Sequence, residues 1–314
     1  MNVNGGFMKK AIVTGANGFV GNNVCKALCN CGVKVYAVIK DTNENISNIE
    51  HLNNLEIVYC ELADIESLYN KIPDRDIDVF YHFAWVGSAG ELRCNEEIQL
   101  QNALWTANAL KTADKMNCKK FVNAGSITEK EAFMAVYAQN SKPSLPYIYG
   151  AGKIAARTIC KPLANSLNID LCWAVITNTY GIGEVSPRLV NSTIRKILSN
   201  EPLQFTSGTQ NYDFIYIDDL ARAFVAIGKY GKANKEYVIG SGNAKPLKEF
   251  LLEMKEALAP NAQMLFGDVP FTGVNLPLEV FDTKDLETDC HFKPEISFAE
   301  GTKMTMEWIK NTNP

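Results

Sequence analysis

Short apolar runs alternate with longer segments of helical periodicity through the first half of the chain. Runs of about 4–8 residues rich in Val, Ile and aromatic side chains are typical of buried strands, and such runs occupy residues 10–14, 34–39, 55–60, 77–83, 120–124 and 170–176. Helical patterns are found at 18–30, 64–71, 95–116 and 149–167. This alternation predicts right-handed βαβ units, and therefore an α/β fold built on a doubly wound parallel sheet.

The pattern is looser after about residue 177. Helices are predicted at 187–199, 218–229, 246–258 and 298–311, with short strands at 203–206, 213–217 and 236–239 among Gly and Pro residues. We expect a doubly wound domain over residues 8–177. A smaller α/β lobe over residues 178–314 is expected to cover a substrate and to be interleaved with the last strands of the sheet.

Composition narrows the class of protein. The 314 residues are 46% hydrophobic and 21% charged, which suits a globular chain with a large core. The net charge of -4 and the lack of a basic block argue against nucleic acid as a partner. No apolar run approaches the ~20 residues of a membrane span, and the start MNVNGGFMKK has no apolar signal core. We therefore expect a cytoplasmic protein with no membrane partner.

Cysteine and histidine usage gives no sign of a metal site. The nine cysteines are scattered, Cys29 and Cys31 are spaced CxC, and the three histidines are scattered too. Zinc sites need closer and more regular ligand spacing, so we predict no metal and reduced thiols. Residues 1–7 precede a second methionine, Met8, and the sequence leaves open whether they are a native leader.

A glycine-rich turn joins the first predicted strand to the first predicted helix. The strand ends at Thr14 and runs into Gly15, Gly18 and Gly21, in the spacing GxxGxxG. Glycines at such a turn let the backbone approach a diphosphate, and the helix N-terminus offers it free N–H groups and a positive dipole. The spacing differs from the GxGxxG of ordinary dinucleotide-binding dehydrogenases, and a plain glycine-rich turn is the structural alternative.

Tyr149 and Lys153 are four residues apart in the helical segment PYIYGAGKIAAR. On a helix these positions lie about 6 Å apart on one face, and an ammonium group there lowers the pKa of a phenol. A free tyrosine titrates near ~10, so such a neighbour would help it exchange protons near neutral pH. Tyr36 and Lys40 share the spacing, but a strand would separate them by about 13 Å. Taken alone, Tyr149 and Lys153 fit a solvated helix pair equally well.

With both motifs present, the chain resembles the extended short-chain dehydrogenase/reductase superfamily, and within it the NAD-dependent epimerase/dehydratase family that modifies nucleotide sugars. The resemblance covers about residues 9–310. It rests on the segments TGANGFVG, YHFAW, QNALWTAN, VNAGSIT, YGAGK, TNTYGIG and YDFIYIDDLARAF, which follow the family's order. The match implies an NAD(P)-binding Rossmann fold and a nucleotide-sugar substrate.

The resemblance also implies roles for individual residues. Tyr149 would move the hydroxyl proton, Lys153 would lower its pKa and hold the nicotinamide ribose, and Ser126 would hydrogen-bond the reacting oxygen. The expected cofactor-binding residues are Gly15, Asn17, Gly18, Phe19, Val20, Gly21, Lys40, Glu61, Leu62, Phe83, Ala84, Tyr149, Lys153 and Ile176. The expected substrate-binding residues are Trp85, Ser88, Ser126, Thr128, Asn178, Arg188 and Tyr212. Structural alternatives are a core position for Trp85 and an ordinary surface charge for Arg188.

Cofactor choice depends on the end of the second predicted strand. An acidic residue there binds the ribose 2′-OH of NAD, whereas a basic residue receives the 2′-phosphate of NADP. The usual acidic position is Ile39 here, followed by Lys40 and then Asp41. The sequence therefore favours NADP(H), with NAD(H) and a merely solvated Lys40 as the alternative.

One departure from the family pattern argues against a dehydratase. Nucleotide-sugar 4,6-dehydratases carry Thr-Asp-Glu where this chain has Ser126, Ile127 and Thr128, and Glu129 is one place out of register. The acid and base that expel water from the sugar are therefore missing.

A second departure concerns the substrate diphosphate. Many epimerases clamp it with an arginine at the position of Tyr212, and with another before the acidic residue that is Asp282 here. Arginine is the usual bidentate partner of phosphate, so Arg188 and Asn178 become the candidates for holding this group.

Three functions fit these residues. The favoured one is a reductase of CDP- or dTDP-linked 4-keto-6-deoxysugars that draws hydride from diffusible NADPH. A nucleotide-sugar 4-epimerase with tightly held NAD would use the same Ser, Tyr and Lys. A non-catalytic dinucleotide-binding protein is disfavoured because that set is intact. The helices at 95–116 and 149–167 are those that related proteins use to dimerise, so the resemblance also implies a homodimer.

Overall fold

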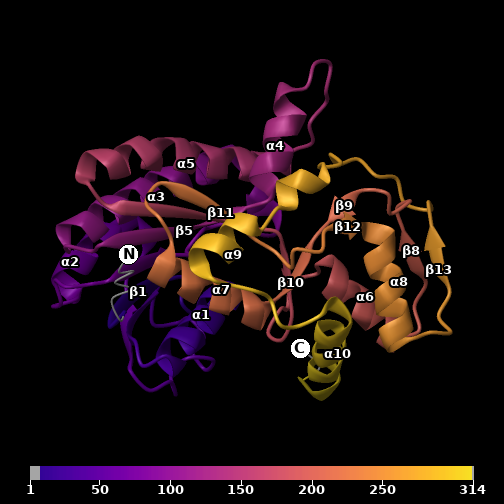
Figure 1. The fold of residues 1–314 in the computed structure, drawn as a ribbon, viewed down its shortest axis with the longest axis horizontal. Coiled ribbons are helices and arrows are strands. Elements are labelled where there is room, and N and C mark those ends of the chain that lie inside the picture. The colour runs from indigo at the N-terminus through magenta and orange to yellow at the C-terminus, as the bar shows by residue number, and fades with distance from the viewer. Residues whose placement is uncertain (1–7, 313–314) are drawn as a thin grey trace.

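A seven-stranded parallel sheet forms the larger lobe of the protein (Figure 1). The computed structural model describes residues 8–312, and the candidate leader at residues 1–7 lies outside them. The strand order is β11-β6-β5-β4-β1-β2-β3, and the bounds are β1 Lys10–Thr14, β2 Lys34–Ile39, β3 Leu55–Tyr59, β4 Val79–His82, β5 Lys120–Ser126, β6 Asp170–Ile176 and β11 Lys235–Ile239. The predicted doubly wound fold is confirmed. The order reverses between β1 and β4, and open α/β sheets bind ligands outside the carboxyl ends of strands at such a point.

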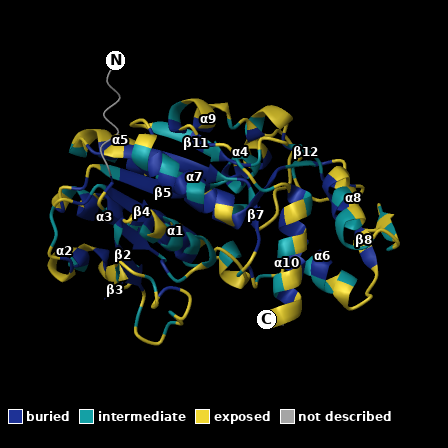
Figure 2. Cartoon of the chain, turned by 60° about the horizontal axis from the view of Figure 1, so that its bottom comes forward, coloured by how far each residue is buried: buried dark blue, intermediate teal, exposed yellow. Residues whose placement is uncertain are grey.

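Helices cover both faces of this sheet, and successive residues of a strand face opposite sides. Ile12 of β1 packs in one apolar core with α3 and α5, whereas Ala11 and Val13 pack in the other with α1 and α7. Figure 2 shows the central strands β4 and β5 between these layers as buried. The helices are α1 Phe19–Asn30, α3 Glu96–Lys115, α5 Tyr147–Leu167 and α7 Ile217–Tyr230.

The smaller lobe is built from helices and short paired strands. Its strands form the pairs β10-β7, β12-β9 and β13-β8. The bounds are β7 Asn178–Tyr180, α6 Leu189–Leu198, β8 Leu203–Phe205, β9 Asn211–Tyr212, β10 Phe214–Tyr216, β12 Lys245–Pro246, α8 Leu247–Leu258, β13 Met264–Phe266 and α10 Phe298–Thr312. β11 comes from the C-terminal half yet pairs with β6, as the predicted interleaving requires. The division of the chain at residues 177 and 178 stays a prediction.

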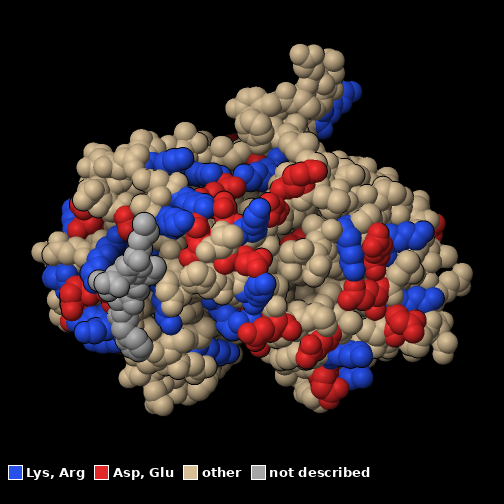
Figure 3. Space-filling model, viewed as in Figure 1, with Lys and Arg blue, Asp and Glu red and all other residues tan. Residues whose placement is uncertain are grey.

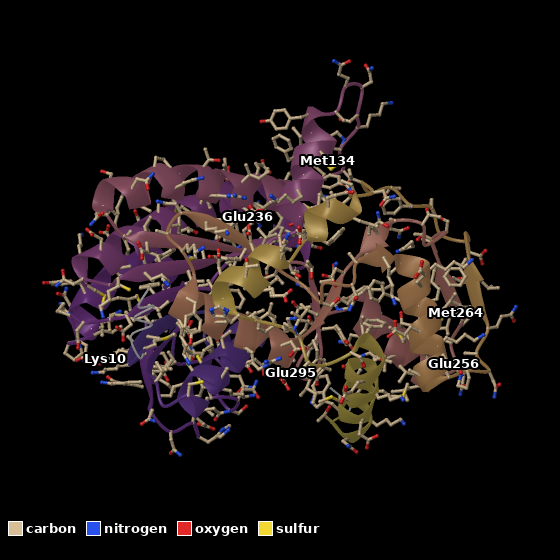
Figure 4. The ribbon with its side chains drawn as sticks, in the orientation of Figure 1. Lys10, Met134, Glu236, Glu256, Met264 and Glu295 are labelled. Carbon is tan, nitrogen blue, oxygen red and sulfur yellow. The ribbon has the colours of Figure 1, made fainter. Side chains whose placement is uncertain are left out.

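Several elements differ from the sequence-based expectation. The helix predicted at 64–71 is a 3₁₀ segment, η1 Leu62–Ser67, followed by the short α2 Leu68–Lys71, because Asp64 has non-helical dihedral angles. α4 Thr128–Tyr137 was not predicted, and it projects from the body of the molecule, where Met134 is labelled (Figure 4). Its larger apolar residues, such as Phe133 and Tyr137, are exposed, and its buried face holds only Glu129, Ala132 and Ala135, so it lacks the strongly apolar stripe by which helices are recognised. The other short segments are η2 Glu91–Cys94, η3 Leu278–Phe281 and α9 Lys284–Cys290.

The surface carries both signs of charge. Lys and Arg are interspersed with Asp and Glu over the face drawn in Figure 3. Among the helices of residues 8–312, none combines the length and apolar character of a membrane span.

Candidate active site

The glycine-rich turn between β1 and α1 forms one wall of the site. Gly15 has a φ of +65°, and a Cβ there would lie 2.9 Å from the backbone N of Ala84, so only glycine fits. α1 begins after Gly18, which offers no side-chain cap. The first-turn N–H groups therefore remain available to an anion. A close backbone approach and an uncapped helix N-terminus fit the diphosphate of a dinucleotide.

A pocket of about 750 Å³ lies at the carboxyl ends of the central strands. The predicted cofactor residues that line it are Gly15, Asn17, Gly18, Phe19, Val20, Gly21, Phe83, Ala84, Tyr149, Lys153 and Ile176. The predicted substrate residues that line it are Trp85, Ser88, Ser126, Thr128, Asn178, Arg188 and Tyr212. Lys40, Glu61 and Leu62 line a second pocket of about 300 Å³, which shares Gly15, Asn17, Ala84 and Trp85 with the first. The fold therefore brings every residue of the predicted site to two adjoining pockets, while their roles stay predictions.

Ser126, Tyr149 and Lys153 meet where β5 ends against α5. Lys153 Nζ donates a 2.8 Å hydrogen bond to the carbonyl of Ala124 and lies 3.7 Å from the ring centroid of Trp85. The same Trp85 ring stands edge-on to Tyr149, with centroids 6.0 Å apart. Thr128 Oγ1 donates to Ser126 Oγ at 2.9 Å. These contacts fix both Lys153 and Ser126 at the pocket wall.

The electrostatics of Tyr149 differ from the prediction. Lys153 was expected to lower the phenol pKa, but burial raises the pKa of Tyr149, and the charges that oppose the rise are Arg93 first and then Arg188. Burial also lowers the pKa of Lys153 to about 7, while the charge of Glu129 opposes that shift. The physical cause of both shifts is desolvation, which penalises the charged forms of Tyr149 and Lys153.

Arg93 is a site residue that the sequence reasoning missed. Its Cζ lies 4.1 Å from the ring centroid of Tyr149, and its Nη1 donates to the carbonyl of Ser88 at 2.9 Å. Burial lowers the pKa of the Arg93 guanidinium, which nevertheless stays charged because arginine titrates above about 12. The available signal was a single arginine in WVGSAGELR, the loop after the fourth predicted strand.

The second pocket carries mixed charge. Lys40 is 63% exposed and lies 3.8 Å from a carboxylate oxygen of Asp41. Glu44 lines the same pocket and accepts a 3.0 Å hydrogen bond from Asn17 Nδ2. Glu44 was also missed, because it lies in a loop beyond the end of β2 with no periodic pattern.

The larger pocket is also lined by Arg188 and a buried acid, Glu184. Arg188 Nε is 3.7 Å from Glu184 Oε2, and the arginine is about half exposed. Glu184 also accepts a 2.9 Å hydrogen bond from the backbone N–H of Ser186. Trp85 donates a 2.7 Å hydrogen bond from Nε1 to Gln99 and lines both pockets, so its position fits ligand contact rather than the core alone. Among residues 8–312, no group of three or more His, Cys, Asp or Glu is arranged to hold a metal ion.

Comparison with known proteins now identifies the class. The model of the NAD dependent epimerase/dehydratase family matches residues 11–240. The chain belongs to this family. It is therefore an NAD(P)-dependent enzyme of the group that modifies nucleotide sugars.

Relatives that are named for different activities have the same sequence identity to this chain. CDP-abequose synthase of Salmonella typhimurium is 26% identical over 94% of this chain and 97% of its own. A putative UDP-glucose 4-epimerase of Methanocaldococcus jannaschii is 26% identical over 96% and 99%. The structure of UDP-N-acetylglucosamine 4-epimerase from Methanobrevibacter ruminantium, at 21% identity, covers 96% of this chain and 98% of its own with a TM-score of 0.79. The structural match confirms the fold.

Proposed function

We propose that this enzyme reduces the C4 ketone of a nucleoside-diphosphate 4-keto-6-deoxysugar with NADPH. The observation that carries the proposal is the meeting of Ser126, Tyr149 and Lys153 in the pocket that the glycine loop also lines. A bound nicotinamide would supply the hydride, which adds to C4. Tyr149 gives its hydroxyl proton to the C4 oxygen, and Ser126 hydrogen-bonds that oxygen as charge develops on it. Together with Arg93, Lys153 supplies positive charge that stabilises the phenolate formed when Tyr149 gives up its proton.

The residues around Ser126 support reduction over dehydration. Ile127 is buried, and the Thr128 hydroxyl donates a hydrogen bond to Ser126 Oγ. Glu129, the nearest acid in sequence, is hydrogen-bonded to Trp173 and does not line the pocket. No carboxyl at this strand end is thus placed to remove a proton from C5 of the sugar.

A nucleotide-sugar 4-epimerase with bound NAD is the second candidate. It is favoured by the carboxylate of Glu44, which lies in the same pocket as Lys40 and would repel a 2′-phosphate. The two functions separate on purification: the reductase loses its cofactor on dialysis and consumes NADPH with CDP- or dTDP-4-keto-6-deoxysugars. Stoichiometric NAD that survives gel filtration, with sugar isomerised and no NADPH consumed, would establish the epimerase instead.

Three further inferences accompany this function. The protein is cytoplasmic, in keeping with its nine free cysteines. It forms a homodimer through α3 and α5, where Leu100, Leu104 and Ile159 are exposed apolar residues. The diphosphate of the substrate is held by Arg188 and Asn178.

Lys40→Gln is expected to weaken NADPH binding by about tenfold, because the 2′-phosphate loses a charge-assisted partner, and to leave NADH binding within about twofold. The matched variant Glu44→Gln should strengthen NADPH binding, since it removes a nearby negative charge. Titration of the NAD(P)H fluorescence measures both. Equal NADPH affinity in wild-type protein and Lys40→Gln would remove the basis for NADP(H).

A further inference from the structure

Glu129 is a buried acidic residue that is hydrogen-bonded to the backbone of the active-site residue Ser126. It lies in the first turn of α4 and is 3% exposed. Oε1 accepts a 2.8 Å hydrogen bond from the backbone N–H of Ser126. Trp173 Nε1 donates to both oxygens, at 3.1 and 3.0 Å. Burial raises the pKa of Glu129, and the hydrogen bonds from Ser126 and Trp173 oppose that rise. All of these partners are N–H donors, which favour the ionised form of a carboxyl group.

The chain makes room for this carboxylate. A Cβ at Gly125 would lie 2.5 Å from Trp173 Nε1 and 2.7 Å from Glu129 Oε1. Contacts that close are not tolerated, so a side chain at position 125 would displace the hydrogen-bonded pair. Gly125 lies between Ala124 and Ser126 on β5.

Glu129 and Lys153 bind neighbouring main-chain groups of β5. β4 pairs with β5 only as far as Asn123, and beyond that point β5 pairs with β6 alone. Lys153 takes the carbonyl of Ala124 and Glu129 takes the N–H of Ser126. Two residues along a strand span about 7 Å, so the buried cation and the buried anion bind β5 within about that distance of each other, at the point where β4 ends. Each charge acts on the pKa of the other.

We propose that Glu129 is a positioning residue that fixes the backbone of Ser126 and serves as the buried counter-charge that keeps Lys153 protonated. The catalytic value of that charge rests on the proposed function, in which a charged Lys153 supports Tyr149. The counter-charge itself does not depend on which substrate the enzyme uses.

The charged and titratable groups around Lys153 and Glu129 determine in which direction Glu129 shifts the pKa of Lys153. Lys153 is faced by Glu129 from α4, by Tyr149 from its own helix and by His82 from β4. His82 is neutral at working pH, because burial lowers its pKa to about 3. Arg157 also faces Glu129, but it forms an ion pair with Glu236 of β11, labelled in Figure 4. Glu129 is thus the anion that offsets the burial of Lys153.

Removal of this negative charge lowers the pKa of Lys153 further, so the lysine loses its proton at a lower pH. It also lowers the pKa of Tyr149, because the charge of Glu129 raises it. For a reduction that needs protonated Lys153 and protonated Tyr149, both changes move the alkaline loss of activity in one direction, toward lower pH.

The test compares Trp173→Phe with Trp173→Phe/Glu129→Gln. Trp173 is replaced by phenylalanine in both proteins because its indole N–H donates to both oxygens of Glu129. In a Glu129→Gln variant one of these oxygens becomes an NH₂ group, which would face the indole N–H donor to donor. Both proteins are labelled with fluorodinitrobenzene over a range of pH, and the modification of the Lys153 peptide is followed by mass spectrometry. The labelling rate reports the uncharged fraction of Lys153 and requires neither substrate nor turnover.

We expect the pH midpoint of Lys153 labelling to fall by at least about one unit when Glu129 is replaced by glutamine. This corresponds to about a tenfold lower ratio of charged to uncharged lysine at a given pH. Glu129→Asp keeps the charge and should retain the wild-type midpoint, which makes it the folded comparison if the double variant does not fold. An unchanged midpoint in the double variant, or a midpoint in Glu129→Asp displaced by as much as one unit, overturns the proposal. A shifted midpoint in an enzyme that reduces no nucleotide sugar overturns the proposed function and leaves the counter-charge standing.

Discussion

Tyr149→Phe is expected to lower turnover by about 10²- to 10⁴-fold, the usual contribution of a positioned acid or base. The variant keeps the aromatic ring that packs against Trp85 and Arg93, and it removes only the hydroxyl that carries the proton. Cofactor affinity should therefore stay within a few-fold of wild type. Steady-state kinetics and NAD(P)H fluorescence titration measure the two quantities separately.

Tyr147→Phe is the matched control for this variant. Tyr147 is on the same helix, one half-turn away, but it is only half-buried and does not line the pocket. It should turn over at the wild-type rate. Near wild-type turnover in Tyr149→Phe, or an equal loss in Tyr147→Phe, would show that Tyr149 is not the proton carrier.

Gly21→Ala is expected to cost about 1–3 kcal/mol of stability, the usual range for forcing extra volume into a packed site, and to weaken cofactor binding at least tenfold. A Cβ at Gly21 would overlap the carbonyl oxygen of Gly15. Both groups are fixed, one in the glycine turn and one in α1, so the helix must move away from the turn. The N–H groups that would hold a diphosphate then move with it. Thermal denaturation and NADPH titration measure the two losses.

Lys26→Ala, in the same helix and half-buried, serves as the control for Gly21→Ala. It should stay within about 0.5 kcal/mol of wild type and bind cofactor normally. If Gly21→Ala bound NADPH as tightly as Lys26→Ala, the close packing of α1 against the glycine turn would not govern cofactor binding.

The sheet and the glycine turn could be predicted because their signals are local. Continuous apolar runs mark strands that are buried on both faces, and Gly15, Gly18 and Gly21 follow one such run directly. The position of Tyr149 and Lys153 on one helix was predicted for the same reason. Helix periodicity places residues four apart on one face, whatever the rest of the fold does.

The electrostatics of the site could not be predicted in the same way. Arg93 reaches Tyr149 from the 3₁₀ segment η2, 56 positions earlier in the chain, and Trp173 reaches Glu129 of α4 from strand β6. The sequence paired Tyr149 with its nearest cation, but burial and Arg93 set its pKa in the folded chain. The missed α4 shows a related limit, because its larger apolar residues are exposed and only two alanines and Glu129 are buried, which gives no apolar stripe in the sequence.

The most direct test of the account follows the hydride itself. The enzyme is incubated with a dTDP- or CDP-4-keto-6-deoxysugar and NADPH that carries deuterium at the transferring position of C4 of the nicotinamide. The account predicts a deoxysugar product with one deuterium at the sugar C4, detected by mass spectrometry and NMR, and its loss in Tyr149→Phe. Isomerised sugar that contains no deuterium, with the labelled NADPH left unconsumed, would contradict it.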